Sequence, residues 1–385
     1  MKAYLILEDG HVFTGKSIGS RKTVISEIVF NTSMTGYEEV LTDPSYSGQA
    51  VCMTYPLIGN YGICYKDQES LRPYMDGFIV HELSRVPSNF REEDTIQAFL
   101  KRYDVPGIEG IDTRALTKIL RESGTMNGMI TTSPDVVPEE VLPQIRAYRT
   151  ENEVEEVTCT EKEFWPATDT VVGGITSPAY KDADPEAPVS GKRTGRKYRV
   201  ALMDFGVKYN IIRSLNQRGC DVTVYPAWTK AEEVLAGHPD GIMLTNGPGD
   251  PKDCPGEIRE VRKLYESDVP IYAICMGHQL MALAAGFNTK KMKYGHRGGN
   301  HPVKDLETGR VYITSQNHGY VVDTDTVDPE IAEPAYVNVN DRTNEGLRYK
   351  GKNIFTTQFH PEACPGPQDS AYLFDKFIRM MGGDQ

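Results

Sequence analysis

The chain has 385 residues, which is long for a single hydrophobic core, so we expect two domains. Its hydrophobic (39%) and charged (25%) fractions are ordinary for a globular protein, and a formal net charge of −12 argues against nucleic acid as a general partner. The 7 scattered cysteines indicate neither a disulfide framework nor a zinc site, and without a signal peptide or a membrane-length apolar run we expect a cytoplasmic protein.

The first predicted elements are two strands over residues 4–7 and 11–17, joined by the type I′ turn dipeptide Asp9-Gly10. Gly10–Ser17 also matches the phosphate-loop pattern GxxxxGK[ST]. A phosphate loop requires a helix that begins at its Lys-Ser, whereas Gly19-Ser20 follow here and more strand-like residues come after them. We therefore expect a hairpin at this position and not an ATP site.

The rest of the first 150 residues mixes the two kinds of secondary structure. Residues 24–64 are rich in β-branched and aromatic residues with turn signals between them, and Ser45 lies in one of these loops. Residues 93–103 and 113–124 have helical spacing, and Asp112 offers an N-cap to the second of these helices. We predict a mixed α+β domain over residues 1–150.

Residues 151–197 differ in composition from both of their flanks. Their first part is acidic, and their later part is rich in proline, glycine, alanine and charged residues, without an apolar period. We predict a linker over residues 151–197.

A parallel α/β pattern begins at residue 198. The predicted elements are a strand at 199–204, a helix at 210–218, a strand at 220–225, a strand at 241–245 and a strand at 269–274. Strands that alternate with helices predict a doubly wound, mostly parallel sheet, whose ligands gather at the carboxyl ends of the strands. We place this second domain over residues 198–385.

Cys275 lies where the strand at 269–274 gives way to a helical pattern. A thiol at a helix N-terminus meets unpaired N–H groups and the positive end of the helix dipole, which favour the thiolate. The small residues Ala273 and Gly277 on either side would permit the strained turn of a nucleophile elbow. A lone cysteine of this kind is more commonly a buried structural residue, so the interpretation depends on its neighbours.

Two other segments offer such neighbours. The loop Asn246-Gly-Pro-Gly-Asp-Pro251 could direct backbone N–H groups at an oxyanion, although a simple turn is the commoner explanation for such a loop taken by itself. Near the end of the chain, a predicted strand carries His360 and Glu362, which are two residues apart and would point the same way. A carboxylate so placed could orient the imidazole toward a thiol; the alternative is an exposed His-Pro-Glu turn.

The remaining cysteine and histidines are weaker candidates. His278 is one turn beyond Cys275 but has no carboxylate to orient it, so we expect a structural role. Cys364 lacks an activating helix end, and His296 and His301 are not spaced like a metal pair, so no metal is predicted.

Together these motifs resemble the small, glutamine-hydrolysing subunits of carbamoyl phosphate synthetases. Residues 198–385 are similar to a class I glutamine amidotransferase domain, with the Asn246, Cys275 and His360 motifs in that family's order. The subfamily resemblance rests on Asn31-Thr-Ser-Met-Thr-Gly-Tyr37, Leu41-Thr-Asp-Pro-Ser-Tyr-Ser47, Gly110-Ile-Asp-Thr-Arg-Ala-Leu116, Asp204-Phe-Gly-Val-Lys208 and Gly295-His-Arg-Gly-Gly-Asn-His-Pro-Val303.

The resemblance implies roles for particular residues. Cys275 would attack the glutamine side-chain amide, His360 would act as acid and base, Glu362 would orient His360, and a thioester would be hydrolysed. The oxyanion hole would be formed by the N–H groups of Gly247 and Met276. The implied glutamine contacts are Ser45, Gly247, Gly249, Met276, Gln279, Asn317, Gly319 and Tyr320.

The resemblance also implies a heterodimer, possibly a higher assembly, with a large synthetase subunit. That partner would bind ATP and magnesium and make carbamoyl phosphate from bicarbonate and the ammonia delivered to it, so no cofactor is expected on this chain. The product could serve pyrimidine or arginine synthesis.

Some alternatives and departures stay open. Another amidotransferase, serving guanylate or anthranilate synthesis, would share the catalytic motifs but should lack the Ser45 loop, and a non-catalytic regulatory subunit could use the same fold. The chain has Ala273 where the elbow usually has glycine, Met276 where leucine is common, Tyr320 where phenylalanine is common, and Cys364 in place of a usual serine. None of these changes removes a reacting group.

Overall fold

The computed structural model describes residues 1–167 and 197–382, so most of the predicted linker lies outside the described residues. The described chain forms two compact units. The first comprises Met1–Glu153 and Lys293–Gly298, and the second takes the rest of the described residues. Within the described ranges, no helix combines the length and the apolar character that crossing a bilayer requires.

The first unit is built on a closed β-barrel, which the sequence did not predict. In barrel order its strands are β1 (Lys2–Leu7), β2 (Val12–Ser17), β8 (Gly107–Glu109), β6 (Gly77–Ile79), β4 (Gln49–Met53), β3 (Val24–Asn31) and β9 (Met126–Thr131). The barrel closes because β9 pairs antiparallel with both β1 and β3. The interior is filled by aliphatic side chains such as Leu5, Ile28 and Ile108, all 0% exposed.

Short elements complete the first unit. They are α1 (Tyr37–Leu41), α2 (Ile96–Arg102), α3 (Thr113–Ser123), α4 (Pro138–Ala147), the 3₁₀ turns η1 (Pro44–Tyr46) and η2 (Tyr65–Asp67), and the two-stranded sheet of β5 (Leu57–Ile58) and β7 (Glu82–Leu83). The predicted N-cap of α3 is confirmed, because the Asp112 side chain accepts a hydrogen bond from the N–H of Ala115.

The phosphate-loop pattern at Gly10–Ser17 lies in the β1–β2 hairpin, as predicted. Gly15 is required for packing: a Cβ atom there would lie 2.3 Å from the carbonyl oxygen of Glu109. Lys16 forms an ion pair with Glu109, with 2.6 Å between Nζ and Oε1. The segment is thus a barrel strand, and it has no helix after it to bind phosphate.

The second unit contains a ten-stranded mixed sheet. In sheet order its strands are β10 (Glu163–Trp165), β12 (Cys220–Pro226), β11 (Tyr198–Asp204), β13 (Gly241–Leu244), β14 (Ile271–Ile274), β19 (Ile354–Thr357), β18 (Asn344–Tyr349), β17 (Ala332–Asn338), β15 (Thr289–Asp305) and β16 (Val311–Val322). The helices are α5 (Glu153–Val157), α7 (Tyr209–Gln217), α8 (Ala231–Ala236), α9 (Pro255–Glu266), α10 (Met276–Ala284) and α11 (Tyr372–Gly382), with 3₁₀ turns η3 (Pro251–Asp253) and η4 (Thr324–Thr326).

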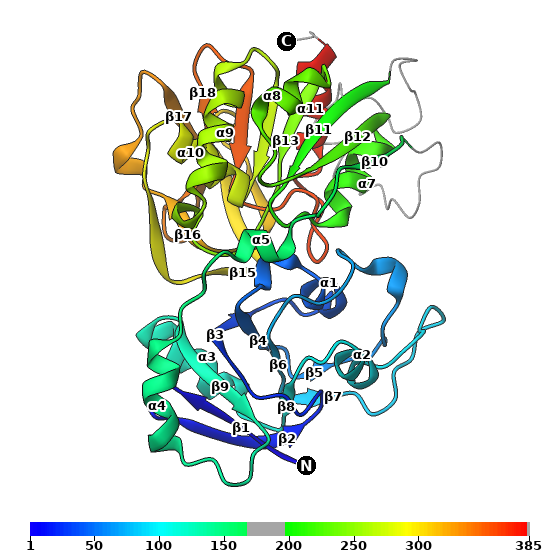
Figure 1. Cartoon of the computed structure of the whole chain (residues 1–385), viewed down its shortest axis with the longest axis vertical. Coiled ribbons are helices and arrows are strands. Elements are labelled where there is room, and N and C mark those ends of the chain that lie inside the picture. The colour runs from blue at the N-terminus through cyan, green and yellow to red at the C-terminus, as the bar shows by residue number, and fades with distance from the viewer. Residues whose placement is uncertain (168–196, 383–385) are drawn as a thin grey trace. The chain divides into compact units, whose positions relative to one another are not determined.

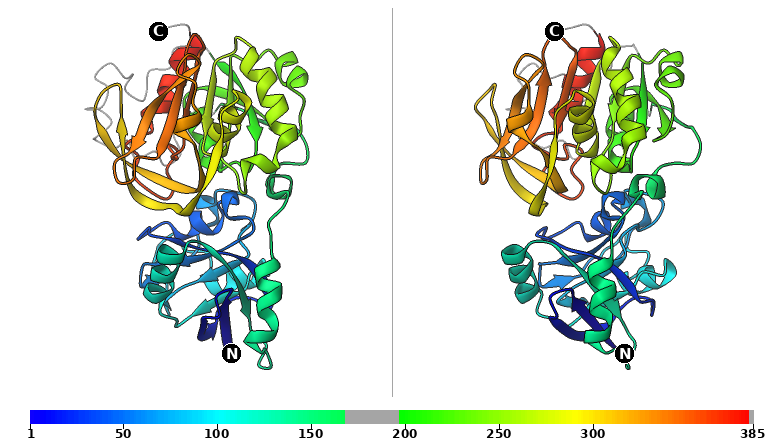
Figure 2. Two further views of the ribbon diagram at one scale, coloured as in Figure 1. Left: turned by 90° about the vertical axis from the view of Figure 1, so that its left-hand side faces the viewer. Right: turned by 60° about the vertical axis from the view of Figure 1, so that its left-hand side comes forward.

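The central strands β12, β11, β13, β14 and β19 are parallel and covered by helices on both faces, which confirms the predicted doubly wound sheet (Figures 1 and 2). Successive β14 residues alternate between two cores: Ile271 and Ala273 pack with α8, α9 and α10, whereas Tyr272 and Ile274 pack with α7 and α11. Because β11 pairs with β12 on one side and β13 on the other, the chain reverses direction across the sheet at β11.

Two features of this unit differ from the prediction. The interval predicted as linker includes α5 and β10, and β10 pairs antiparallel with β12 as an edge strand. An antiparallel extension, β15 to β18, lies between β14 and β19 in the sequence. The sequence did not predict α5 because the segment is mostly acidic. Val154 and Val157 are its only apolar residues, and both are buried in the core.

Candidate active site

Cys275 lies on the tight turn between β14 and α10 that the sequence predicted. Its backbone has φ 53° and ψ −104°, a conformation that costs a non-glycine residue about 1–3 kcal/mol. Its N–H donates to the carbonyl oxygen of Thr357 at 2.8 Å, which fixes the turn against β19. Gly277 is needed because a Cβ atom would lie 2.5 Å from the Leu244 carbonyl oxygen. The turn thus has the backbone strain of a nucleophile elbow.

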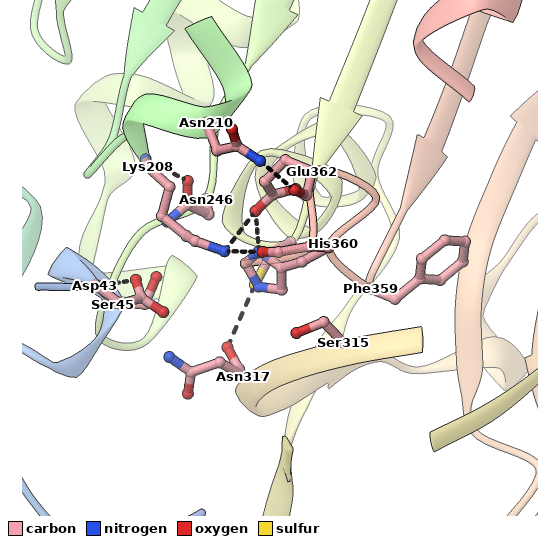
Figure 3. Close-up of polar contacts among 12 residues, drawn as sticks. Asp43, Ser45, Lys208, Asn210, Asn246, Ser315, Asn317, Phe359, His360 and Glu362 are labelled. Atoms are coloured by element: carbon pink, nitrogen blue, oxygen red, sulfur yellow. Dashed lines mark hydrogen bonds and ion pairs between the residues drawn. The ribbon is translucent and has the colours of Figure 1, made fainter. Parts of the chain in front are cut away.

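Two polar groups contact the buried sulfur of Cys275, which is 2% exposed. Sγ lies 3.7 Å from the carbonyl oxygen of Asn317 on β16, and Nε2 of Gln358 lies 3.6 Å from Sγ. The Asn317 contact is drawn as a dashed line in Figure 3.

His360 comes three residues after β19 ends, so the prediction that the strand continues through Glu362 is wrong. The N–H of His360 donates to the Ser315 carbonyl oxygen at 2.9 Å, and the chain then turns. Even so, Nδ1 of His360 lies 2.6 Å from Oε1 of Glu362. The Cys275 sulfur also interacts with this imidazole, both through its charge and through a side-chain hydrogen bond. The turn brings the two side chains together, as the extended chain was expected to do.

Glu362 is a buried carboxylate with two cationic partners. Besides His360, Nζ of Lys208 lies 3.0 Å from Glu362 Oε1, and Figure 3 shows both groups reaching the carboxylate. Burial raises the pKa of Glu362, but Lys208 and then His360 outweigh burial and hold that pKa below its usual range. Burial lowers the pKa of His360, whereas Glu362 and the Cys275 sulfur raise it, and the net direction is upward. The three groups therefore form one coupled charged cluster.

Lys208 and its neighbours also hold the loop around Glu362 in place. Lys208 Nζ donates to the Ala363 carbonyl oxygen at 2.7 Å, and the side-chain amide of Asn210 donates to the carbonyl oxygen of Glu362. Asn210 Nδ2 also donates to Cys364 Sγ at 3.4 Å. The thiol of Cys364 therefore accepts a hydrogen bond from a side chain that supports this loop.

The glycine loop after β13 lies at the same edge of the sheet. Asn246 ties it to the β11–α7 connection, since Nδ2 donates to the Gly206 carbonyl oxygen at 2.8 Å and Oδ1 accepts from the N–H of Lys208 at 3.2 Å. A Cβ atom on Gly247 would lie 2.2 Å from the Phe205 carbonyl oxygen. The N–H of Gly277 is already used by Thr245, at 2.8 Å, whereas Met276 is the first residue of α10.

Comparisons with known proteins agree with this geometry. Residues 201–380 match the family model described as "Glutamine amidotransferase class-I", and residues 5–130 match "Carbamoyl-phosphate synthase small chain, CPSase domain". The chain is 50% identical over 381 residues to a carbamoyl phosphate synthase small chain from Bacillus caldolyticus, covering 99% of this chain and 97% of the relative. It is 51% identical over 379 residues to the one from Clostridium perfringens, covering 98% and 99%.

The chain belongs to the carbamoyl phosphate synthase small chain family. A further relative, the pyrimidine-specific small chain of Bacillus subtilis, is 47% identical over 381 residues, covering 99% of this chain and 96% of the relative. The predicted family is thereby confirmed. In this small chain the class I amidotransferase match coincides with the doubly wound sheet.

The predicted glutamine contacts fall in both units of this small chain. Gln279 on α10 donates through Nε2 to the Tyr320 carbonyl oxygen at 2.8 Å, so α10 and β16 lie together. Asn317, Gly319 and Tyr320 are all on β16, and Gly249 follows β13 with φ 85°. Ser45 belongs to the first unit, where it is buried in η1 and its N–H donates to Asp43 Oδ1 at 2.9 Å. These glutamine contacts stay predictions.

His278 has the structural position that its lack of a carboxylate suggested. It is 0% exposed, and its Nδ1 lies 2.7 Å from Oγ1 of Thr356 on β19. Burial lowers the pKa of His278 to about 3, so the ring is neutral at physiological pH. It links α10 to the sheet without a charge.

Sequence reasoning did not assign three polar residues around the predicted triad of this small chain: Lys208, Asn246 and Gln358. Lys208 and Asn246 lie inside motifs that carried the resemblance, which was the available signal. No local pattern connects Lys208 to Glu362, because 154 positions separate them in the chain. Gln358 sits in an apolar strand-like run, where a single amide gives no pattern of its own.

Replacing Gly247 by alanine should lower kcat for glutamine hydrolysis by about 100-fold, the cost of losing one oxyanion-hole donor. The added methyl group would collide with the Phe205 carbonyl oxygen at 2.2 Å and displace the loop. Steady-state glutaminase kinetics measure the effect. Gly256→Ala in α9 is the matched control, since no atom lies within 4 Å of the new Cβ. Equal kcat values for the two variants would contradict a role for the Gly247 N–H.

Proposed function

We propose that this chain is the glutaminase component of a carbamoyl phosphate synthase and hydrolyses L-glutamine with Cys275, His360 and Glu362. The observation that carries the proposal is the convergence of a strained cysteine, an imidazole and a carboxylate held by Lys208 at one edge of the sheet. A buried structural cysteine does not need this arrangement. The family membership supplies the reaction class, and the geometry supplies the groups that perform it.

The proposed reaction begins with attack of the Cys275 thiolate on the side-chain carbonyl carbon of glutamine. A C–S bond forms and the carbonyl electron pair moves to oxygen, where the N–H groups of Gly247 and Met276 would stabilise the negative charge. The C–N bond then breaks as His360 protonates the leaving nitrogen, which gives ammonia and a thioester. His360 next removes a proton from water, which attacks the thioester and releases glutamate and the thiol.

Glu362 would orient His360 throughout this cycle. Because the carboxylate accepts from Nδ1, the Nε2 atom is the one left to exchange protons with sulfur, substrate and water. Lys208 would keep the carboxylate ionised and in place by its ion pair with Oε1. Ser45, Gly249, Gln279, Asn317, Gly319 and Tyr320 are the proposed contacts that bind glutamine.

The ammonia is proposed to pass to a large synthetase subunit in a heterodimer. The name "small chain" of the relatives suggests such a partner, and the hairpin at Gly10–Ser17 is a barrel strand that does not offer a phosphate loop. ATP and magnesium are accordingly proposed to act on the partner, in the cytoplasm. The domain limits 1–150 and 198–385 are also proposals.

Trapping with radiolabelled glutamine tests the function directly. The full chain is mixed with labelled glutamine, quenched in acid within the first turnovers, and digested for peptide mass analysis. We expect label on the peptide that contains Cys275, and labelled glutamate in the unquenched reaction. Absence of both, with and without a synthetase partner, would favour the non-catalytic regulatory subunit. Labelling together with ammonia transfer only to a guanylate or anthranilate synthase would favour another amidotransferase.

A further inference from the structure

Gln358 is a buried amide that contacts the sulfur of the proposed nucleophile. It directly follows β19 and is 0% exposed. Its backbone N–H donates to the Glu345 carbonyl oxygen at 2.9 Å, which fixes the backbone. Its side-chain Nε2 lies 3.6 Å from Cys275 Sγ. Burying an amide is unfavourable unless both of its ends are hydrogen-bonded, so the partner of each end is informative.

The neighbours of Gln358 decide which end of its amide faces the sulfur. The Tyr320 carbonyl oxygen can only accept, so the Gln279 atom 2.8 Å away must be the donor Nε2. The same Nε2 lies 3.0 Å from the side-chain amide of Gln358, which must therefore present its acceptor Oε1. A reversed Gln358 would place two NH₂ groups against each other. The hydrogen-bond network thus directs the side-chain NH₂ group of Gln358 at Cys275 Sγ.

The Tyr320 carbonyl oxygen is held by a second donor, which strengthens this assignment. Nδ1 of His318 lies 2.8 Å from the same oxygen, while Nε2 of His318 lies 2.9 Å from Gln316 Oε1. The oxygen therefore stays in place between α10 and β16. The orientation of Gln279 depends on that oxygen, and the orientation of Gln358 depends on Gln279.

We infer that Gln358 is a catalytic residue that donates a hydrogen bond to the Cys275 sulfur and stabilises the thiolate before attack. The inference rests on the proposed function for its role in glutamine hydrolysis. The contacts that Asn317 and Gln358 make with the sulfur suit different protonation states. A thiol can donate to the Asn317 carbonyl oxygen at 3.7 Å, but a thiolate cannot, and it gains instead from the N–H group of Gln358.

A thiolate donor of this kind acts in the step that precedes bond formation. His360 removes the sulfur proton, and the negative charge then forms beside the Gln358 N–H group in a site that excludes water. During attack the sulfur loses its charge to the carbonyl oxygen, so the Gln358 contact weakens as the oxyanion hole takes over. Loss of the donor should therefore lower the fraction of reactive thiolate more than it affects glutamine binding.

Gln358→Met is the main test variant, because methionine is similarly long and unbranched but has no N–H donor. Cys275 is alkylated with iodoacetamide between pH 5 and pH 10 in the full chain, and its peptide is quantified by mass spectrometry. We expect the half-maximal rate to move upward by about one pH unit, and kcat to fall about 10- to 100-fold with little change in KM, as for loss of a hydrogen bond to a charged group.

Two further variants guard against misfolding and general effects. Gln358→Glu keeps an acceptor for Gln279 and replaces the donor that faces sulfur, so it should also move the profile upward. Gln97→Glu on α2 introduces the same chemical change in the first unit and should leave the profile unchanged. Thermal unfolding midpoints establish which variants are folded.

The outcomes separate the inference from the proposed function. An upward shift in folded Gln358 variants supports the inference, even if the wild-type chain fails to hydrolyse glutamine and the proposed function falls. An unmoved alkylation profile in a folded Gln358 variant overturns the inference, even if wild-type hydrolysis is normal. A large rise in KM with unchanged kcat also overturns it, since Gln358 would then serve binding alone.

Discussion

Replacing Cys275 by serine should abolish glutamine-dependent synthesis in the complex with the synthetase subunit and spare synthesis from added ammonia. We expect glutamine hydrolysis to fall by about 10⁴- to 10⁶-fold, the range for loss of a catalytic nucleophile. A serine hydroxyl holds its proton far more tightly than a thiol does. The variant would keep the strained turn with φ 53° but would still have only His360 as its base. Glutamine- and ammonia-dependent rates measured on the same complex check the result.

Cys364→Ser is the matched control for this experiment. Cys364 lies only two residues beyond Glu362, but its sulfur accepts from Asn210, and serine can accept the same hydrogen bond. Both activities should therefore persist in that variant. Loss of both activities in Cys275→Ser would show that Cys275 is structural, and loss of glutamine use in both variants would argue that any change near this loop is harmful.

Replacing Lys208 by methionine should lower the free energy of unfolding by about 3–5 kcal/mol, the usual cost of removing one partner of a buried ion pair. Both side chains are almost fully buried, 2% and 0% exposed, so solvent cannot replace the lost partner of Glu362. kcat should fall as well, because Glu362 would no longer be held against His360. Chemical denaturation and glutaminase kinetics on the same preparation measure both effects.

The pH dependence provides a second readout for this variant. Lys208 is the largest influence that lowers the pKa of Glu362, so burial should move that pKa upward in its absence. A depressed carboxyl pKa stabilises the fold at pH values above the unfolded pKa, and this stability is lost as the pH falls through the folded value. Lys208→Met should therefore begin to lose stability and activity at a higher pH than the wild type.

Two variants show whether the ion pair is the cause. Lys208→Met combined with Glu362→Gln removes both charges and should recover part of the stability, although not the activity. Lys263→Met removes a lysine that is 45% exposed and pairs with the exposed Glu232 and the buried Glu260. Because Glu260 keeps its bonds to Lys230 and to the Ala231 N–H, this variant should unfold at nearly the wild-type midpoint. A double variant no more stable than Lys208→Met would assign the loss to packing of the lysine stem.

The parts of the fold that depend on local rules were predictable from the sequence. Strand-to-helix alternation and two-faced burial specify the doubly wound sheet, and the turn at Cys275 follows from a buried run that meets a helical pattern. The first unit was harder because its barrel closes through β9, which pairs with β1 more than a hundred positions earlier in the chain. Closure depends on register and tilt, which short segments do not reveal.

The same limit applies to the candidate site. His360 and Glu362 are close in sequence, so their contact could be predicted, although the backbone between them is a turn and not a strand. Lys208 and Gln358 contact residues that are distant in the sequence. Lys208 is 154 positions from Glu362, and Gln358 is 83 positions from Cys275. Such pairs are specified by the packed sheet, because only its strand order brings their loops together.

The hydrogen bond from the N–H of Cys275 to the Thr357 carbonyl oxygen has a consequence for how the protein is made. A ribosome that has completed α10 has produced a thiol whose turn still lacks its anchor, since Thr357 lies 82 residues beyond Cys275 in the chain. The backbone turn of the proposed nucleophile can form completely only once β19 docks beside β14. Unfinished chains would therefore carry an ordinary cysteine, and reactivity would arise only in molecules whose sheet is assembled.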